Sequence, residues 1–175
     1  MAILPVMKYP NEVLTTRSVE VDTIDDDLKR LVSDMVDTMY AASGVGLAAN
    51  QVGIARRLAL IDLSVGEDPE QLIVMINPEI VASSGVNSEE EGCLSFPGIS
   101  EIVARPDQVQ MRAIDLDGKI FTLEGQGLLA RAICHEVDHL DGTLFIDRLT
   151  GFKKERVRRQ IRRNVDTGAW AEVYP

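Results

Sequence analysis

The sequence lacks the features that mark membrane and secreted proteins. No apolar run approaches the roughly 20 residues that a helix needs to cross a bilayer, and the first five residues do not combine a charged start with an apolar stretch, as a signal peptide does. Two cysteines in 175 residues are too few for a disulfide framework. We therefore expect a cytoplasmic protein with no membrane partner.

Aromatic residues are also scarce, at 5% of the chain, and no repeat, linker or low-complexity run divides it. The hydrophobic share of 45% and the charged share of 26% are those of an ordinary globular protein. Because 175 residues is a usual size for one domain, we expect residues 1–175 to form a single domain.

The formal net charge is −10, yet the segment 151–165 is strongly basic. It holds seven lysines and arginines against Glu155 alone, a net charge of +6. Such a density attracts phosphate backbones, but the solvated face of a C-terminal helix explains it equally well. No aromatics interleave with these arginines to stack on single-stranded nucleic acid, and we expect no DNA partner.

Hydrophobic periodicity predicts an α+β fold. Residues 23–42 repeat apolar side chains at helical spacing, with Thr23 or Asp25 available to cap the first turn. The glycines after residue 43 then open a loop. Strands are expected at 57–63, 72–78, 101–105, 108–115 and 120–125, with Asn77-Pro78 ending the second and Asp117-Gly118 forming a hairpin turn before the last.

Two further helices are expected near the C-terminal end. Residues 127–140 carry apolar side chains around most of a helix, which therefore belongs inside the protein, and Gly142 can terminate it. A last amphipathic helix at about 152–165 carries the basic cluster. The pattern predicts mixed or antiparallel sheets wrapped around one buried helix, with an N-terminal and a C-terminal helix outside.

Both histidines of the chain lie in that buried helix, in the sequence HEVDH at 135–139. A lone buried histidine is usually a hydrogen-bonded core residue. Side chains four residues apart on a helix share one face, however, so His135 and His139 can offer two nitrogens to a single ion. This spacing, with glutamate after the first histidine, is a short motif of metal-dependent hydrolases.

A catalytic metal site of this kind needs a third protein ligand and an open position for water. Cys93 is the best candidate, because Gly92 and Pro97-Gly98 mark irregular backbone that can approach the helix, and a thiolate suits Zn²⁺ or Fe²⁺. A structural core cysteine is the alternative. Cys134 adjoins His135 but points to another side of the helix.

Glu136 follows His135 by about 100° around the helix, so it should flank an ion rather than bind it. There it can exchange protons with an attacking water and a leaving group; an ion pair is the alternative. Asp138 and Asp141 could orient ligands, but exposed carboxylates are commoner on helices, and we assign them no role.

These residues resemble those of a known family. GVGLAANQ (44–51), EGCLS (91–95) and HEVDH (135–139) are similar, in order and spacing, to the three motifs of the bacterial peptide deformylases, and the likeness extends over nearly the whole chain up to the basic tail. Asn50 departs from the threonine or proline common in the family, but Gln51 beside it is retained.

The resemblance implies a hydrolase that removes the formyl group from the N-terminal methionine of newly made polypeptides and releases formate, with attack by a metal-activated water. It makes Cys93, His135 and His139 the ligands and Glu136 the general acid/base. Gln51, by its amide, and Leu94, by its backbone N–H, would stabilise the developing oxyanion. Gly46 would let the substrate backbone run close.

The resemblance also implies a pocket for the methionine side chain lined by Val45, Leu128, Arg131 and Ala132. The family uses Fe²⁺ in cells and accepts Ni²⁺, Co²⁺ or Zn²⁺. Segment 152–175, a basic C-terminal helix and tail, would suit docking on the ribosome near the exit of the nascent chain.

Four alternatives compete with this interpretation. A zinc endopeptidase would take its third ligand from a histidine or glutamate downstream of His139, where only Asp141, Asp147 and Glu155 are at hand. A protein with a structural metal would need four ligands. An RNA-binding module would rely on the basic segment alone. A deformylase that has lost its activity would share the fold.

Overall fold

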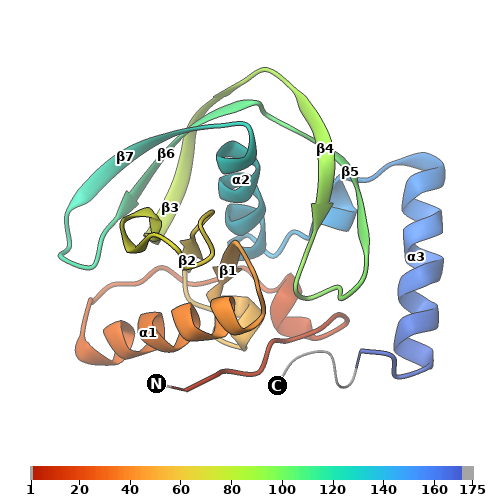
Figure 1. Ribbon diagram of the computed structural model, residues 1–175, viewed down its shortest axis with the longest axis horizontal. Helices are drawn as coiled ribbons and strands as arrows, with labels where there is room; N and C mark the ends of the chain where they lie inside the picture. The colour runs from red at the N-terminus through yellow and green to blue at the C-terminus, as the bar shows by residue number, and fades with distance from the viewer. Residues whose placement is uncertain (1, 171–175) are drawn as a thin grey trace.

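The computed structural model describes residues 2–170 and has the α+β architecture expected from the sequence (Figure 1). Within these residues no helix is long and apolar enough to cross a membrane. The helices and strands are α1 (Asp26–Ala41), β1 (Gly46–Ala48), β2 (Leu58–Ile61), β3 (Ile73–Ser84), β4 (Asn87–Gly92), β5 (Ser100–Arg105), β6 (Gln108–Ile114), β7 (Ile120–Gln126), α2 (Leu128–Leu140) and α3 (Gly151–Asp166).

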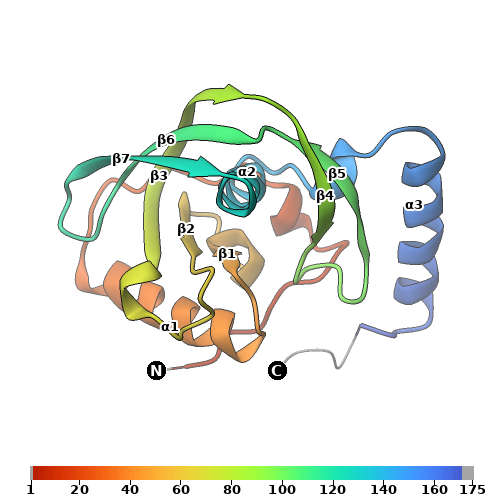
Figure 2. The same cartoon turned by 45° about the horizontal axis from the view of Figure 1, so that its top comes forward.

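Two antiparallel sheets surround α2. One has the strand order β1-β2-β3-β6-β7 and the other pairs β4 with β5. Figure 2 looks nearly along α2 and shows the strands curving around it, with α1 below and α3 outside β5. The helix is enclosed because apolar side chains cover most of its circumference, and eleven of its residues are buried.

Local signals set the element ends much as the sequence predicts. The Asp25 side chain accepts a hydrogen bond from Leu28 N–H at 2.8 Å and caps α1. Gly142, at φ 72°, ends α2, and Gly118, at φ 78°, closes the β6–β7 hairpin. Helix α3 is one residue longer at each end than the predicted 152–165, and tail residues 171–175 lie outside the described residues.

The prediction that Asn77-Pro78 ends a strand was wrong. Strand β3 continues to Ser84, with a register shift against β6 between Ile76 and Glu79. Asn77 adopts φ 50°, and its side chain exchanges two hydrogen bonds with the Val21 backbone. The bulge therefore accommodates a proline, which has no N–H to donate, without ending the strand.

Two strands were missed altogether. β1 lies within the segment expected to be a loop, and β4 has the sequence NSEEEG, which shows no apolar alternation. β4 is a strand because its six residues pair with β5, in register from Asn87 with Arg105 to Gly92 with Ser100. Pairing with the next strand decided its structure against its local preference.

Candidate metal centre and active site

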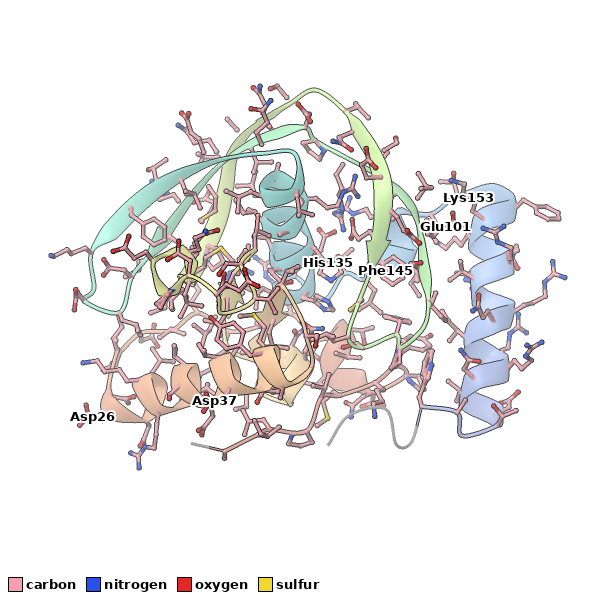
Figure 3. All side chains as sticks on the ribbon, in the orientation of Figure 1. Asp26, Asp37, Glu101, His135, Phe145 and Lys153 are labelled. Carbon is pink, nitrogen blue, oxygen red and sulfur yellow. The ribbon has the colours of Figure 1, made fainter. Side chains whose placement is uncertain are left out.

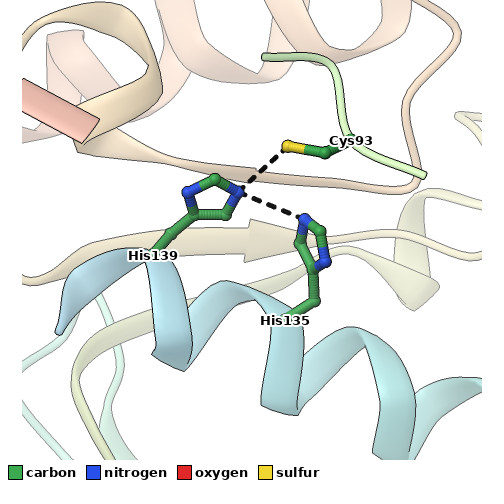
Figure 4. A group of neighbouring side chains, drawn as sticks. All are labelled: Cys93, His135 and His139. Atoms are coloured by element: carbon green, nitrogen blue, oxygen red, sulfur yellow. Dashed lines mark hydrogen bonds between the residues drawn. The ribbon is translucent and has the colours of Figure 1, made fainter. Parts of the chain in front are cut away.

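Cys93, His135 and His139 converge at one point beside α2. The two histidines lie one turn apart on the helix, and Cys93 directly follows β4, which runs past the helix. His139 Nε2 lies 3.2 Å from Cys93 Sγ and 3.2 Å from His135 Nε2 (Figure 4). The ligand atoms of all three residues lie within 4.8 Å of one another.

This donor set fits a metal ion. One sulfur and two imidazole nitrogens are ligands that Fe²⁺, Zn²⁺, Co²⁺ and Ni²⁺ accept. Burial and the adjacent His135 hold the pKa of His139 well below the ordinary 6.5, which favours the neutral, ligand form of its ring. Burial also lowers the pKa of His135, but hydrogen bonds with Cys93 and Glu91 outweigh it and raise the pKa well above 6.5.

A buried ion-pair network lies behind His135. Glu91, on β4, accepts from His135 Nδ1 at 2.7 Å, from Arg105 at 2.6 Å and from Arg131 at 2.8 Å. Arg105 also pairs with Asp138 at 2.6 Å. The carboxylate therefore fixes the ring orientation of His135 and leaves Nε2 turned towards Cys93 and His139.

Sequence reasoning missed most of this network. Glu91 stands in a run of three glutamates that resembles a solvated strand, and Arg105 closes a short strand with no motif around it. Asp138 had been given no role because helix carboxylates are usually exposed. It is buried and held between Arg105 and Arg148, the latter at 2.6 Å. Asp141 pairs with Arg57 at 2.6 Å.

The segment after β1 supports the other histidine. Asn50 Nδ2 donates to the backbone oxygen of His139 at 2.6 Å, so the residue that departs from the family pattern has a structural partner. Gln51 is buried beside it. Its Oε1 accepts from Ala48 N–H at 3.0 Å, and its Nε2 lies 3.2 Å from Ser95 Oγ and 3.5 Å from Cys93 Sγ.

Glu136 is a buried carboxylate without an ion-pair partner. Its side chain is 3% exposed, and Oε2 has no hydrogen-bond partner among the described residues. Burial raises its pKa from the ordinary 4.5 to about 7, although His135 lowers it. A methyl group built on Gly46 would collide with Glu136 Oε1. The ion pair considered as an alternative role for Glu136 is therefore absent from residues 2–170.

A pocket of about 610 Å³ opens beside this carboxylate. Val45 and Leu128 are exposed, whereas Arg131 and Ala132 are buried in the wall. The guanidinium of Arg131 is tied to Glu91 and to the backbone oxygen of Val103. The site residues that line the pocket are Val45, Gly46, Gln51, Cys93, Leu94, Leu128, Arg131, Ala132, His135 and Glu136.

Comparisons with known proteins identify the family of this chain. Residues 3–155 match the family model of polypeptide deformylase. The peptide deformylase of Acidobacterium capsulatum is 49% identical over 170 residues, covering 97% of this chain and all of that protein. The chain belongs to the polypeptide deformylase family.

Solved structures agree with this assignment. A peptide deformylase from Legionella pneumophila superposes with a TM-score of 0.89 at 43% identity, covering 96% of this chain and 98% of that one. A plant peptide deformylase, PDF1B, superposes with a TM-score of 0.90 at 35% identity, covering 98% and 94%. The resemblance drawn from the three motifs is confirmed, and this deformylase is a metal-dependent hydrolase that removes the N-terminal formyl group of newly made polypeptides.

Proposed function

We propose that Cys93, His135 and His139 hold one Fe²⁺ ion and that Glu136 is the general acid/base for hydrolysis of formyl-methionyl polypeptides. The single observation that carries this is the meeting of three ligand atoms next to a buried carboxylate with a free oxygen. The metal, when bound, would supply Lewis-acid activation of the attacking water. Ni²⁺, Co²⁺ or Zn²⁺ would fit the same donors.

Glu136 moves the proton in this scheme. Its pKa of about 7 lies close to neutral pH, where a carboxylate can both accept and release a proton. It would accept the proton of the water that adds to the formyl carbon. It would then deliver this proton to the amine as the carbon–nitrogen bond breaks, and formate and a free N-terminus result.

Gln51 and Leu94 would bind the oxygen that becomes negative during the attack. The Ala48 N–H fixes the Gln51 carbonyl, which turns its amide nitrogen towards Cys93. The Leu94 N–H belongs to the residue after the thiol, on the same pocket wall. Two donors aimed at a developing oxyanion typically contribute a few kcal/mol each.

The pocket would take the methionine side chain. Gly46 supplies an open backbone against which an extended substrate can pair as an added strand, and the absence of a Cβ leaves room for Glu136. Val45, Leu128, Ala132 and the stem of Arg131 offer apolar contact to an unbranched side chain.

The rival zinc endopeptidase finds less support. Its third ligand would have to be a carboxylate downstream of His139, but Asp141 is paired with Arg57, and Asp147 Oδ2 accepts from Leu144 N–H at 2.9 Å. Cys93 offers a thiol at the place where that ligand is needed. Among residues 2–170 three ligands converge rather than four, which also argues against a purely structural metal.

The experiment is an anaerobic assay of formate release from formyl-Met-Ala-Ser, with metal analysis of the same sample. Cys93→Ser should lose metal and activity together, by about a hundredfold or more in metal affinity. The matched control is Cys134→Ser, which changes the other cysteine, buried in the apolar cluster around α2. Equal metal content in both variants would remove Cys93 from the ligand set.

We further propose that residues 1–175 act as one catalytic domain in the cytoplasm and that the basic segment 152–175 docks on the ribosome. Arg159 and Arg163 are exposed, share one face of α3 and pair with no acidic group among residues 2–170. Arg159→Glu with Arg163→Glu should weaken co-sedimentation with ribosomes about tenfold or more. The control variant, Lys29→Glu with Arg30→Glu on α1, makes the same charge change elsewhere on the protein. It should co-sediment with ribosomes as wild type does.

A further inference from the structure

The ligand Cys93 and the oxyanion donor Leu94 stand at the start of a loop, 93–99, between β4 and β5. Two turns shape it, with Phe96 N–H donating to Cys93 O at 2.9 Å and Ile99 N–H to Phe96 O at 3.1 Å. All seven residues except Ser95 line the pocket. The loop therefore sets both a metal ligand and one wall of the substrate site.

Residues 167–170, which follow α3, return to this loop. Gly168, at φ 68°, and a hydrogen bond from Ala169 N–H to Asn164 O turn the backbone at the end of the helix. Trp170, the one tryptophan of the sequence, is 6% exposed. Its indole Nε1–H donates to the backbone oxygen of Pro97 at 2.8 Å.

Trp170 also completes an aromatic cluster that reaches the metal ligands. Its ring meets Phe96 edge-on at 6.1 Å, and Phe96 meets Phe145 edge-on at 5.4 Å. Phe145 in turn stacks beside His135, with ring centres 6.4 Å apart, and both residues are labelled in Figure 3. Phe96 is fully buried, so its position depends on these neighbours.

We propose that Trp170 is a positioning residue for deformylation, because its hydrogen bond to Pro97 and its contact with Phe96 hold loop 93–99 in the arrangement that places the Cys93 thiol and the pocket wall. The inference rests on the proposed ligand role of Cys93. It also gives α3 a second role beside the proposed ribosome docking, because the position of this helix places Trp170 against the loop.

Trp170→Phe tests this, because phenylalanine keeps an aromatic ring and removes the N–H donor. A buried hydrogen bond of this kind shifts an equilibrium by about fivefold. We expect metal release from the Zn²⁺-loaded protein to a chromogenic chelator to become about fivefold faster. KM for formyl-Met-Ala-Ser should rise by a similar factor through the displaced pocket wall, and kcat should fall by about fivefold through the displaced Leu94 N–H.

Ile161→Ala is the matched control. Ile161 lies on α3, is 4% exposed and packs in the same cluster as Trp170, but it makes no hydrogen bond to the loop. The variant should lower the melting temperature while leaving KM and metal release within about twofold of wild type. The same rises in both variants would show that Trp170 contributes only packing, and no rise in Trp170→Phe would overturn the proposal.

Hydrogen exchange at the Phe96 and Ile99 amides gives a readout that needs no metal. Both amides close the loop turns, and their exchange should be faster in Trp170→Phe than in wild type or in Ile161→Ala. Unchanged exchange would contradict the inference even if the enzyme is fully active. A wild-type protein that binds no metal and releases no formate would instead refute the proposed function.

Discussion

Two buried carboxylates flank His135 and behave in opposite ways. Glu91, on β4, is 6% exposed, and Glu136, on α2, is 3% exposed. Burial raises the pKa of Glu91, but hydrogen bonds from His135 and Arg105 more than reverse this and hold the pKa far below the ordinary 4.5. Burial raises the pKa of Glu136 to about 7. Similar exposure thus gives opposite protonation behaviour.

The two pKa values differ because the two carboxylates have different neighbouring side chains. Glu91 faces Arg105 from the paired strand and Arg131 from the helix, and both guanidinium groups are buried with it. Glu136 faces the pocket and has one oxygen without a partner among the described residues. A permanently charged carboxylate can orient a histidine, whereas one that titrates near neutral pH can transfer a proton.

The variant Glu136→Gln tests the difference between the two carboxylates and has the largest expected effect. The substitution keeps the shape of the side chain and removes proton transfer, so kcat should fall by about a thousandfold. Metal content and melting temperature should stay at the wild-type values, because no ion pair is lost. Metal content by elemental analysis and formate release would be measured on one preparation, and turnover within tenfold of wild type would remove the assigned role.

The variant Glu91→Gln should instead lower the free energy of unfolding. It removes the carboxylate that pairs with Arg131 and one of the two that pair with Arg105, and breaking a buried ion pair in this way typically costs about 3 kcal/mol or more in the free energy of unfolding. Denaturant unfolding of the metal-free protein at pH 7 measures this loss. Glu89→Gln on the same strand is the control, since Glu89 is exposed, and it should change stability by less than about 0.5 kcal/mol.

The pH dependence of the stability loss in Glu91→Gln tests whether Glu91 stabilises the protein in its ionised form. Because the folded pKa of Glu91 lies below the ordinary 4.5, the unfolded chain takes up the proton first as pH falls. The stabilisation by ionised Glu91 is therefore complete above about pH 4.5 and declines towards the folded pKa. The stability gap between wild type and Glu91→Gln should narrow from pH 5 to pH 3, and a constant gap would mean that the ionised state is not the source.

Gly46→Ala is expected to give the smallest effect, through the contact that its added methyl group makes with Glu136. The added methyl group would collide with the Glu136 carboxylate and displace it, and we expect kcat to fall by about tenfold, which corresponds to about 1.4 kcal/mol in the barrier. The double variant Gly46→Ala with Glu136→Asp, whose shorter side chain relieves the collision, should lose less activity than the two single losses combined. Strict additivity of the kinetic losses would show that the two residues do not interact.

Much of the fold was predictable because local signals agreed with the tertiary structure. The periodicity of α1 and α2, the cap at Asp25 and the turn at Gly118 all depend on neighbouring residues. β1 and β4 were missed because β1 has only three residues and β4 has no apolar alternation, so each is a strand through its pairing with the strand that follows it. The prediction of a strand end at Asn77 was wrong because the bulge there depends on hydrogen bonds with Val21 and Arg57, which are remote in the sequence.

The sequence by itself determined the donor types of the candidate metal site, since helical spacing alone puts His135 and His139 on one face, and three ordered motifs identify the family. Only the tertiary structure decided which buried carboxylates near the site are paired, and that Glu136 has an oxygen without a partner among residues 2–170. Glu91, Arg105 and Asp138 meet because β4, β5 and α2 pack together. Ionisation depends on distances between groups remote in the chain, and these distances exist only once the chain has folded.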